Sequence, residues 1–309
     1  MRARWAALPP GAGAAVMATG VLSVGLHLIG QEPLSRVALG LAAALWLLLA
    51  AGFAARLAGD RARWRAEADT PPALTAVAAT TVLGTRLCLL GWRVPAAALL
   101  VVAVALWPGL LLSVVRHWRW RMPGSVFLVC VATQGLAVLT AALSLAGAGD
   151  WLGAAGWVPF WLGLLLYVPA LARFDLRQVG TGAGDQWVAG GALAISALAA
   201  AMLAAAPPWT GAAHHVLRTA ALVLLALSLA WYVVLTAAEL IRPRLRYDVR
   251  RWSTVFPLGM TAVAALATAT VIAAPALHTL GRVLLWIGVG AWLLTAAGLL
   301  AGHGRGRGD

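Results

Sequence analysis

The residues of this sequence that could act on a ligand carry positive charge or hydroxyl groups. Arg86 lies inside a long apolar stretch, about two helical turns from its end. An arginine there costs about 1–3 kcal/mol unless it reaches lipid head groups or faces water. One interpretation is that the long side chain extends to the head groups. The other is that Arg86 supplies fixed charge at the outer mouth of an anion pathway, where it raises the local anion concentration.

His27 follows Thr19 and Ser23 at four-residue steps, so the three side chains share one face of a helix. This face could line the same outer mouth as Arg86. The simpler interpretation, which the pattern favours, is an ordinary histidine at the end of a helix.

The sequence lacks the patterns of catalytic sites and of cation pathways. No paired acids lie within an apolar stretch, and neither HExxH, GxSxG nor a phosphate-binding loop occurs. Of the ten acids, only Glu239 and Asp185 lie near the ends of apolar stretches. Cation pumps and proton-coupled carriers usually need carboxylates inside the membrane, so the pattern argues against a cation pathway. Cys88 and Cys130 read as buried apolar residues. We predict no enzyme activity, no metal site and no cofactor.

The elements that must position these residues are long apolar helices. A chain of 309 residues that is 62% hydrophobic and 11% charged is too apolar for a soluble domain. About 20 apolar residues span a bilayer as a helix. We predict an all-α protein that forms one integral membrane domain over residues 1–309. Its ten spans are expected at about 10–30, 34–57, 72–92, 95–116, 123–147, 151–173, 185–206, 212–241, 253–274 and 278–302.

Arginine gathers in every second gap between the spans. Eighteen of the 23 arginines lie in the two tails and in the gaps after the even-numbered spans. Because positive loops stay in the cytoplasm, both termini are predicted to be cytoplasmic, in a multi-pass protein of the plasma or inner membrane. A net charge of +13 would suggest nucleic acid in a soluble protein. Here the arginines lie at span ends and meet anionic lipid head groups, so no nucleic acid is expected.

Hydroxyl and amide residues are concentrated in the odd-numbered spans, with the Ala-rich seventh as the exception. Lipid offers such groups no hydrogen-bond partners, so they are not expected on helices that face lipid all round. We therefore predict five helical hairpins with the odd helices inside, around a central pore. The alternative is that each serine or threonine bonds to a carbonyl of its own helix. The candidates for lining the pore are Thr19, Ser23, Thr81, Arg86, Thr133, Gln134 and Thr261.

The ninth span begins with the run Trp-Ser-Thr-Val-Phe-Pro-Leu-Gly at 252–259. Pro257 is expected to bend the helix, and Gly259 to give it flexible support. Phe256, directly before the bend, is a candidate gate, because apolar constrictions can close a pore by excluding water. The alternative is that Phe256 simply packs between helices.

The run at 252–259 resembles the ninth-helix signature of the tellurite-resistance/dicarboxylate transporter family. That family includes bacterial tellurite-resistance permeases, fungal malate permeases and plant slow anion channels. Leu8-Pro-Pro-Gly11 is similar to its first-helix opening, and Pro123-Gly124 with Val131-Ala-Thr-Gln134 to its fifth helix. The resemblance implies a homotrimer with one pore in each subunit, lined by the odd helices and occluded by Phe256. It also implies anionic substrates such as chloride, nitrate, dicarboxylates and sulfite.

The sequence therefore favours a passive or weakly coupled anion channel or transporter for small anions or C4-dicarboxylates. A proton-coupled dicarboxylate (malate) or sulfite carrier with the same fold remains the first alternative. A membrane-embedded enzyme or assembly subunit is more remote, and its only candidate site is the arginine-rich loop 242–251 with Tyr247 and Asp248. The transported anion, the gating signal and any tellurite resistance stay open.

Overall fold

The computed structural model describes residues 12–244 and 247–305, and within these residues it is helical without strands. The predicted Leu8–Gly11 motif and the start of the first span lie outside the described residues, as does Arg246. Among the described residues, nine helices are long and apolar enough to cross a membrane, and α2 adds a shorter apolar helix. The long helical elements are α2 (Gly13–Leu28), α3 (Glu32–Gly59), α5 (Thr75–Leu89), α6 (Arg93–Arg116), α7 (Leu128–Leu145), α9 (Trp157–Arg173), α11 (Val188–Ala205), α12 (Gly211–Ile241), α13 (Trp252–Ile272) and α14 (Pro275–Arg305).

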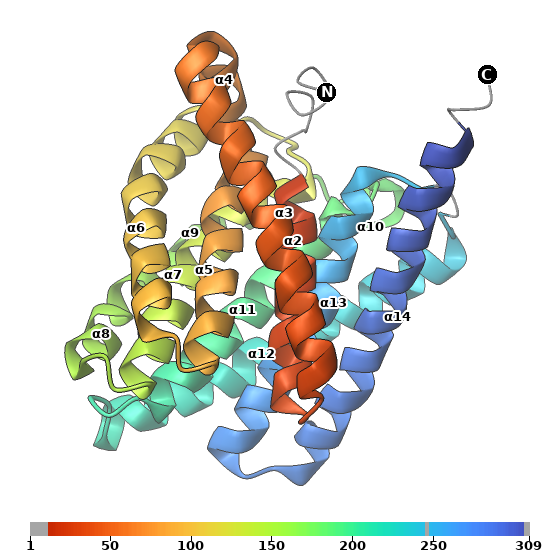
Figure 1. The fold of residues 1–309 in the computed structure, drawn as a ribbon. Coiled ribbons are helices and arrows are strands. Elements are labelled where there is room, and N and C mark those ends of the chain that lie inside the picture. Colours follow the sequence, from red (N-terminus) through yellow and green to blue (C-terminus); the bar gives the residue numbers. More distant parts are fainter. Residues whose placement is uncertain (1–11, 245–246, 306–309) are drawn as a thin grey trace.

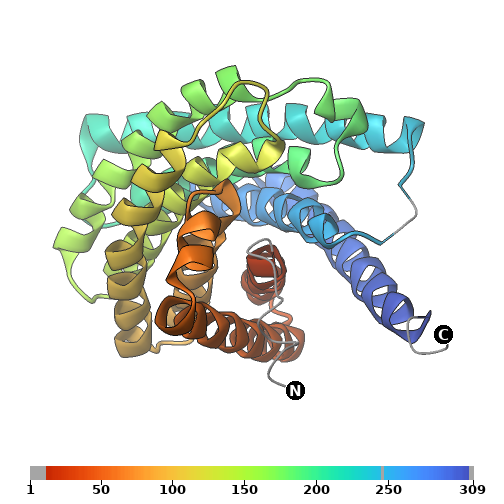
Figure 2. The same cartoon turned by 90° about the horizontal axis from the view of Figure 1, so that it is seen from above.

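Five of these helices form a closed inner ring. Helices α2, α5, α7, α11 and α13 each pack against the next one, and α13 packs against α2 to complete the ring. Helices α3, α6, α9, α12 and α14 lie outside it, each in a hairpin with its preceding inner helix (Figures 1 and 2). The inner helices are mostly buried, whereas most of each outer helix faces outward. The prediction of an all-α bundle with odd helices inside and even helices outside is confirmed.

Ala-rich α11 belongs to the inner ring although it contains almost no hydroxyl groups. Nearly every residue from Val188 to Ala204 is buried, and Ser196 donates its hydroxyl to Ala192 O of its own helix. Small side chains let neighbouring helices approach closely in a membrane. Position in the ring therefore follows from side-chain size for α11, and from polarity for the other four inner helices.

The two ends of the bundle are built differently. At one end, short 3-10 turns precede four of the inner helices, namely η2 (Pro71–Leu74), η3 (Gly124–Phe127), η4 (Asp185–Trp187) and η5 (Val249–Arg251). The short helices α4 (Arg61–Ala68), at the top of Figure 1, and α10 (Gln178–Thr181) lie at this same end. We call it the arginine-rich end, because it carries Arg61, Arg119, Arg177 and Arg250. Helix α4 was not predicted from the sequence.

At the opposite end, tight turns join each inner helix to its outer partner. Gly91 has a φ of +83° in the turn between α5 and α6, a conformation that glycine adopts without steric strain. Ala273, in the turn between α13 and α14, has a φ of +56° and lacks that freedom. Helix α8 (Asp150–Ala155) lies at this end, before α9. These short turns keep the paired helices antiparallel and in contact.

Candidate functional site

A small cavity of about 20 Å³ lies on the axis of the inner ring, and every inner helix contributes to its wall. This volume holds about one water molecule. Its wall is apolar apart from two threonines, and it contains no charged side chain. The lining residues are Val21, Val24, Thr81, Val82, Thr85, Gly135, Val138, Ile195, Leu198, Met260 and Val263.

The two lining threonines keep their hydroxyl hydrogens within their own helix. Thr81 Oγ1 donates to Ala78 O at 2.9 Å, and Thr85 Oγ1 donates to Thr81 O at 2.8 Å. Such bonds satisfy a threonine inside a helix without a partner across the cavity. Of the hydroxyl residues predicted to line a pore, Thr81 is the one that reaches this cavity, and Thr85 was missed. Its spacing of four residues from Thr81 was the available signal.

Phe256 lies beside the axis, one helical turn from the cavity on the side of the arginine-rich end. Its side chain is 1% exposed, and Met260, four residues later on the same face of α13, lines the cavity. Across the ring, Gly191 precedes the lining residue Ile195 by one turn. A Cβ atom built on Gly191 would lie 3.4 Å from Cε1 of Phe256. The aromatic ring of Phe256 therefore lies beside Gly191 in the contact between α11 and α13, and the ring of Pro257 comes closer still to Gly191.

Pro257 and Gly259 lie within α13, which continues through both. A Cβ atom on Gly191 would approach Cγ of Pro257 to 2.8 Å, so the proline ring packs against α11. A Cβ atom on Gly259 would lie 2.8 Å from Cγ1 of Val21, so Gly259 marks a close approach of α13 to α2. Both residues hold the helix that carries Phe256 tightly against its neighbours in the ring.

Other predicted hydroxyl residues face outward, where they join neighbouring hairpins. In each of the five junctions, one side chain of an outer helix bonds to the next inner helix, and these side chains recur every 60 to 64 residues. A buried indole or hydroxyl needs such a partner. The contacts are Trp46 Nε1 to Thr80 Oγ1 at 2.9 Å, Trp107 Nε1 to Thr133 Oγ1 at 3.0 Å, Tyr167 Oη to Ala189 O at 3.3 Å, Ser228 Oγ with Thr261 Oγ1 at 3.2 Å, and Trp292 Nε1 to Thr19 Oγ1 at 2.9 Å.

Gln134 also points away from the central cavity. Its Nε2 donates to Phe160 O of α9 at 2.9 Å, close to Gly163. Its Oε1 is buried and has no hydrogen-bond partner among the described residues. Gln134 therefore lies in the contact between α7 and the outer helix α9.

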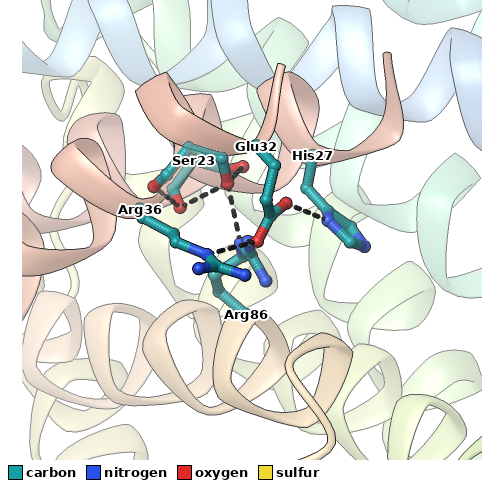
Figure 3. A network of polar contacts seen from close by, with 6 residues as sticks. Ser23, His27, Glu32, Arg36 and Arg86 are labelled. Carbon is teal, nitrogen blue, oxygen red and sulfur yellow. Dashed lines mark hydrogen bonds and ion pairs between the residues drawn. The ribbon is translucent and has the colours of Figure 1, made fainter. Parts of the chain in front are cut away.

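Arg86 forms the centre of a polar network at the end opposite the arginine-rich one (Figure 3). Its side chain is 0% exposed. Nη2 lies 2.9 Å from Glu32 Oε1 and Nε donates to Ser35 Oγ at 2.9 Å, while Nη1 has no partner among the described residues. Ser23 and Ser35 each donate a hydroxyl hydrogen to the backbone carbonyl of the other. The network joins α5, α3 and α2.

Glu32 also contacts His27 and Arg36 in this network (Figure 3). Its Oε2 lies 2.7 Å from His27 Nδ1, and its Oε1 lies 3.1 Å from Arg36 Nε. Because Arg86 is buried and paired, it does not extend to the head groups, and its charge is compensated at close range. The sequence interpretation missed Glu32. Its spacing of five residues from His27 and four from Arg36 was the available signal.

The arginine-rich end carries a second network, around the start of α13. Arg244 and Arg251 both pair with Glu239, the latter at 2.7 Å. Buried Asp185 accepts a hydrogen bond from Ser125 N at 3.2 Å. Burial lowers the pKa of the Arg244 guanidinium. The pairs with Glu239 fix the loop before α13 to the end of α12, and the Asp185 contact joins η4 to η3.

Tyr247 and Asp248, the two candidates for an enzymatic site, take part in structural contacts at this end. Asp248 accepts the backbone N–H of Arg250 at 2.8 Å, and its hydrogen bonds to Arg250 lower the pKa of its carboxyl. Tyr247 Oη accepts from Trp252 Nε1 at 3.3 Å. Both side chains therefore help to fix the entry into α13.

A comparison with protein families relates this architecture to known proteins. The family model described as SLAC1, voltage-dependent anion channel, matches residues 7–300. The chain belongs to the SLAC1 family. The matched residues include the whole inner ring and Phe256, and they agree with the resemblance found in the motifs. The SLAC1 assignment makes the chain a multi-pass membrane protein of an anion channel and transporter family. No curated protein matches the chain.

Proposed function

We propose that this protein conducts small anions or C4-dicarboxylates along the axis of its inner ring and that Phe256 closes the path. The observation that carries the proposal is the position of Phe256, one turn from a central cavity whose wall comes from all five inner helices. The wall of this cavity contains no carboxylate and the chain has a net charge of +13, and both favour anions over cations.

The proposed gate works by apolar occlusion. The cavity beside Phe256 has room for about one water, and its threonine hydroxyls donate to their own helix. A hydrated anion loses its water there without gaining hydrogen-bond donors, so the described conformation blocks passage. Opening requires the Phe256 ring to leave the space beside Gly191.

The arginine-rich end is proposed to face the cytoplasm, which places both termini in the cytoplasm of a cell with the protein in its plasma or inner membrane. The bias of eighteen arginines toward this side supports the orientation. The assembly is proposed to be a homotrimer with one pathway in each subunit, as the family resemblance implies.

Ion selectivity in proteoliposomes tests this function. Under a potassium chloride gradient, Phe256→Ala should conduct, with a reversal potential close to that of chloride. Phe160→Ala is the matched control, because Phe160 is equally buried but lies on the outer helix α9. A reversal potential close to that of potassium, or no conductance in a correctly folded Phe256→Ala protein, would contradict the proposal.

Proton-coupled transport of malate or sulfite is the second candidate function. The wall of the central cavity contains no titratable side chain, which favours uncoupled movement. We therefore expect a pH gradient alone to drive no malate or sulfite uptake, while chloride and nitrate move down their own gradients. Accumulation of malate that follows the pH gradient, without chloride or nitrate flux, would establish the carrier instead.

A further inference from the structure

A second cavity, of about 250 Å³, lies on the outside of the inner ring between α3, α4, α5 and α6. Its wall is mainly apolar and includes Trp46, Phe53, Val102 and Leu106 from the two outer helices. Its floor is formed by the inner helix α5, with Ala76 and Ala79 among the contributors. This cavity is more than ten times larger than the one on the axis.

The position of the cavity indicates an occupant that comes from the bilayer. Helices α3 and α6 are both membrane-length helices of the outer ring, and most of their surface faces outward. A cavity that opens among such helices is reached from lipid. Small residues such as Ala76 leave space that the protein itself does not fill. Hydrocarbon in that space stabilises the apolar wall through van der Waals contacts.

The cavity ends beneath α4, a helix that carries several arginines. Trp64 and Ala68 of α4 line the cavity, and Trp64 packs edge-on against Phe53 with 5.7 Å between ring centroids. Arg61 and Arg65 lie on the same helical face as Trp64 and Ala68, at three- and four-residue steps. This places two guanidinium-bearing residues beside the end of an apolar cavity.

Neither Arg61 nor Arg65 forms an ion pair within the part of the chain that the structure describes, and both are exposed. The neighbouring Arg56 and Arg63 share one carboxylate, that of Glu67. Arg56 Nε lies 3.1 Å from Glu67 Oε2, and Arg63 Nε lies 3.0 Å from Glu67 Oε1. Glu67 therefore offsets only one of these two positive charges, and Arg61 and Arg65 are without an ion pair among the described residues.

We propose that this cavity binds one acyl chain of an anionic phospholipid, whose phosphate is held by Arg61 and Arg65. Guanidinium groups bind phosphate oxygens through paired hydrogen bonds, and basic residues at the membrane surface attract anionic lipid. With the orientation proposed above, the lipid belongs to the cytoplasmic leaflet. The acyl chain would contact the face of α5 that carries Ala76 and Ala79. The opposite face of α5 carries Thr81 and Thr85, which line the central cavity.

Lipid retention by the purified full-length protein tests this site. Native mass spectrometry would compare phosphatidylglycerol with phosphatidylcholine of the same chain length. We expect the protein to retain phosphatidylglycerol about tenfold more strongly, and Arg61→Gln/Arg65→Gln to abolish that preference. The matched control is Arg119→Gln/Arg177→Gln, which removes two exposed arginines of the same end away from the cavity and should keep the preference.

A filling variant tests the apolar part of the site independently. Ala76→Phe places an aromatic ring in the cavity, so it should lower retention of the bound lipid while the protein elutes as wild type does on size exclusion. Equal retention of both lipids by the wild type would overturn the proposal, because it indicates only a non-specific lipid shell. A change of oligomeric state in Ala76→Phe with unchanged lipid retention would also overturn the proposal. That result would indicate that a second copy of the protein, and not a lipid, occupies the cavity.

Discussion

The guanidinium of Arg86 lies 2.9 Å from the carboxylate of Glu32, and this buried contact joins α5 of the inner ring to the first turn of α3. Arg86 is therefore not an isolated charge in an apolar helix. Its closest counter-charge comes from 54 residues earlier in the chain. Two consequences can be measured, one for the stability of the fold and one for the electric field at this end of the inner ring.

Glu32→Gln should lower the thermal unfolding midpoint by several degrees. The substitution leaves Arg86 fully buried without a counter-charge, which is a strongly unfavourable state. Arg36→Gln is the matched control, because Arg36 pairs with the same carboxylate while its side chain is 69% exposed. Surface pairs of this kind contribute little, so the control should unfold at nearly the wild-type temperature. An equal decrease of the unfolding midpoint in Glu32→Gln and Arg36→Gln would show that the contact with Arg86 does not dominate the contribution of Glu32 to stability.

Arg86→Ala should lower anion flux several-fold at low ionic strength and much less at high ionic strength. The variant removes one positive charge from the network at this end of the inner ring, and salt screens the effect of that charge on approaching anions. Flux in proteoliposomes at two salt concentrations measures the difference. A loss that is the same at both concentrations would indicate that Arg86 acts through the packing of α5 against α3 alone.

Thr81→Val and Thr133→Val should behave differently although they make the same chemical change. Thr81 lines the central cavity, so removing its hydroxyl should alter the nitrate-to-chloride permeability ratio. Thr133 accepts from Trp107, so its loss leaves a partly buried indole N–H unpaired and costs about 1 kcal/mol of stability without changing that ratio. Bilayer recordings together with thermal unfolding separate the two effects. A permeability change in Thr133→Val alone would place the pathway elsewhere.

Ala273→Gly should stabilise the protein by about 0.5–1 kcal/mol. Ala273 holds a left-handed conformation in the turn between α13 and α14, which is strained for any residue with a Cβ atom. The comparison variant is Ala297→Gly within α14, where glycine should destabilise the helix by about 1 kcal/mol. Thermal unfolding of both variants tests whether Ala273→Gly raises and Ala297→Gly lowers the stability. A loss of stability in both variants would contradict the strain at Ala273.

The sequence was sufficient for the layering of the helices. Lipid can solvate apolar helices on the outside, so polar content predicts that the odd helices lie inside, and short turns predict the hairpins. It was not sufficient for the direction of single side chains. Thr133 and Thr81 both lie on inner helices, but one contacts Trp107 and the other the cavity. Helices that are apolar on nearly every face carry no clear signal of rotation about their axes.

The contact of Arg86 with Glu32 was missed for a related reason. Glu32 lies at the junction of a loop and a helix, and nothing in its local sequence indicates a partner on α5. Phe256 was singled out because a phenylalanine followed directly by Pro257, with Gly259 two residues further on, stands out inside an apolar helix, and its role as a gate stays a prediction. Local motifs could thus be interpreted from the sequence, whereas contacts across the bundle required the structure.

A graded series at Phe256 tests the central claim most directly. Anion flux through proteoliposomes would be measured for Phe256→Leu, Phe256→Val and Phe256→Ala beside the same three substitutions at Phe160. The account predicts that flux rises stepwise as the side chain at Phe256 shrinks, while the Phe160 series stays at the wild-type level. Flux that is unchanged across the Phe256 series in folded protein, or that rises equally in both series, would contradict a pathway closed by Phe256.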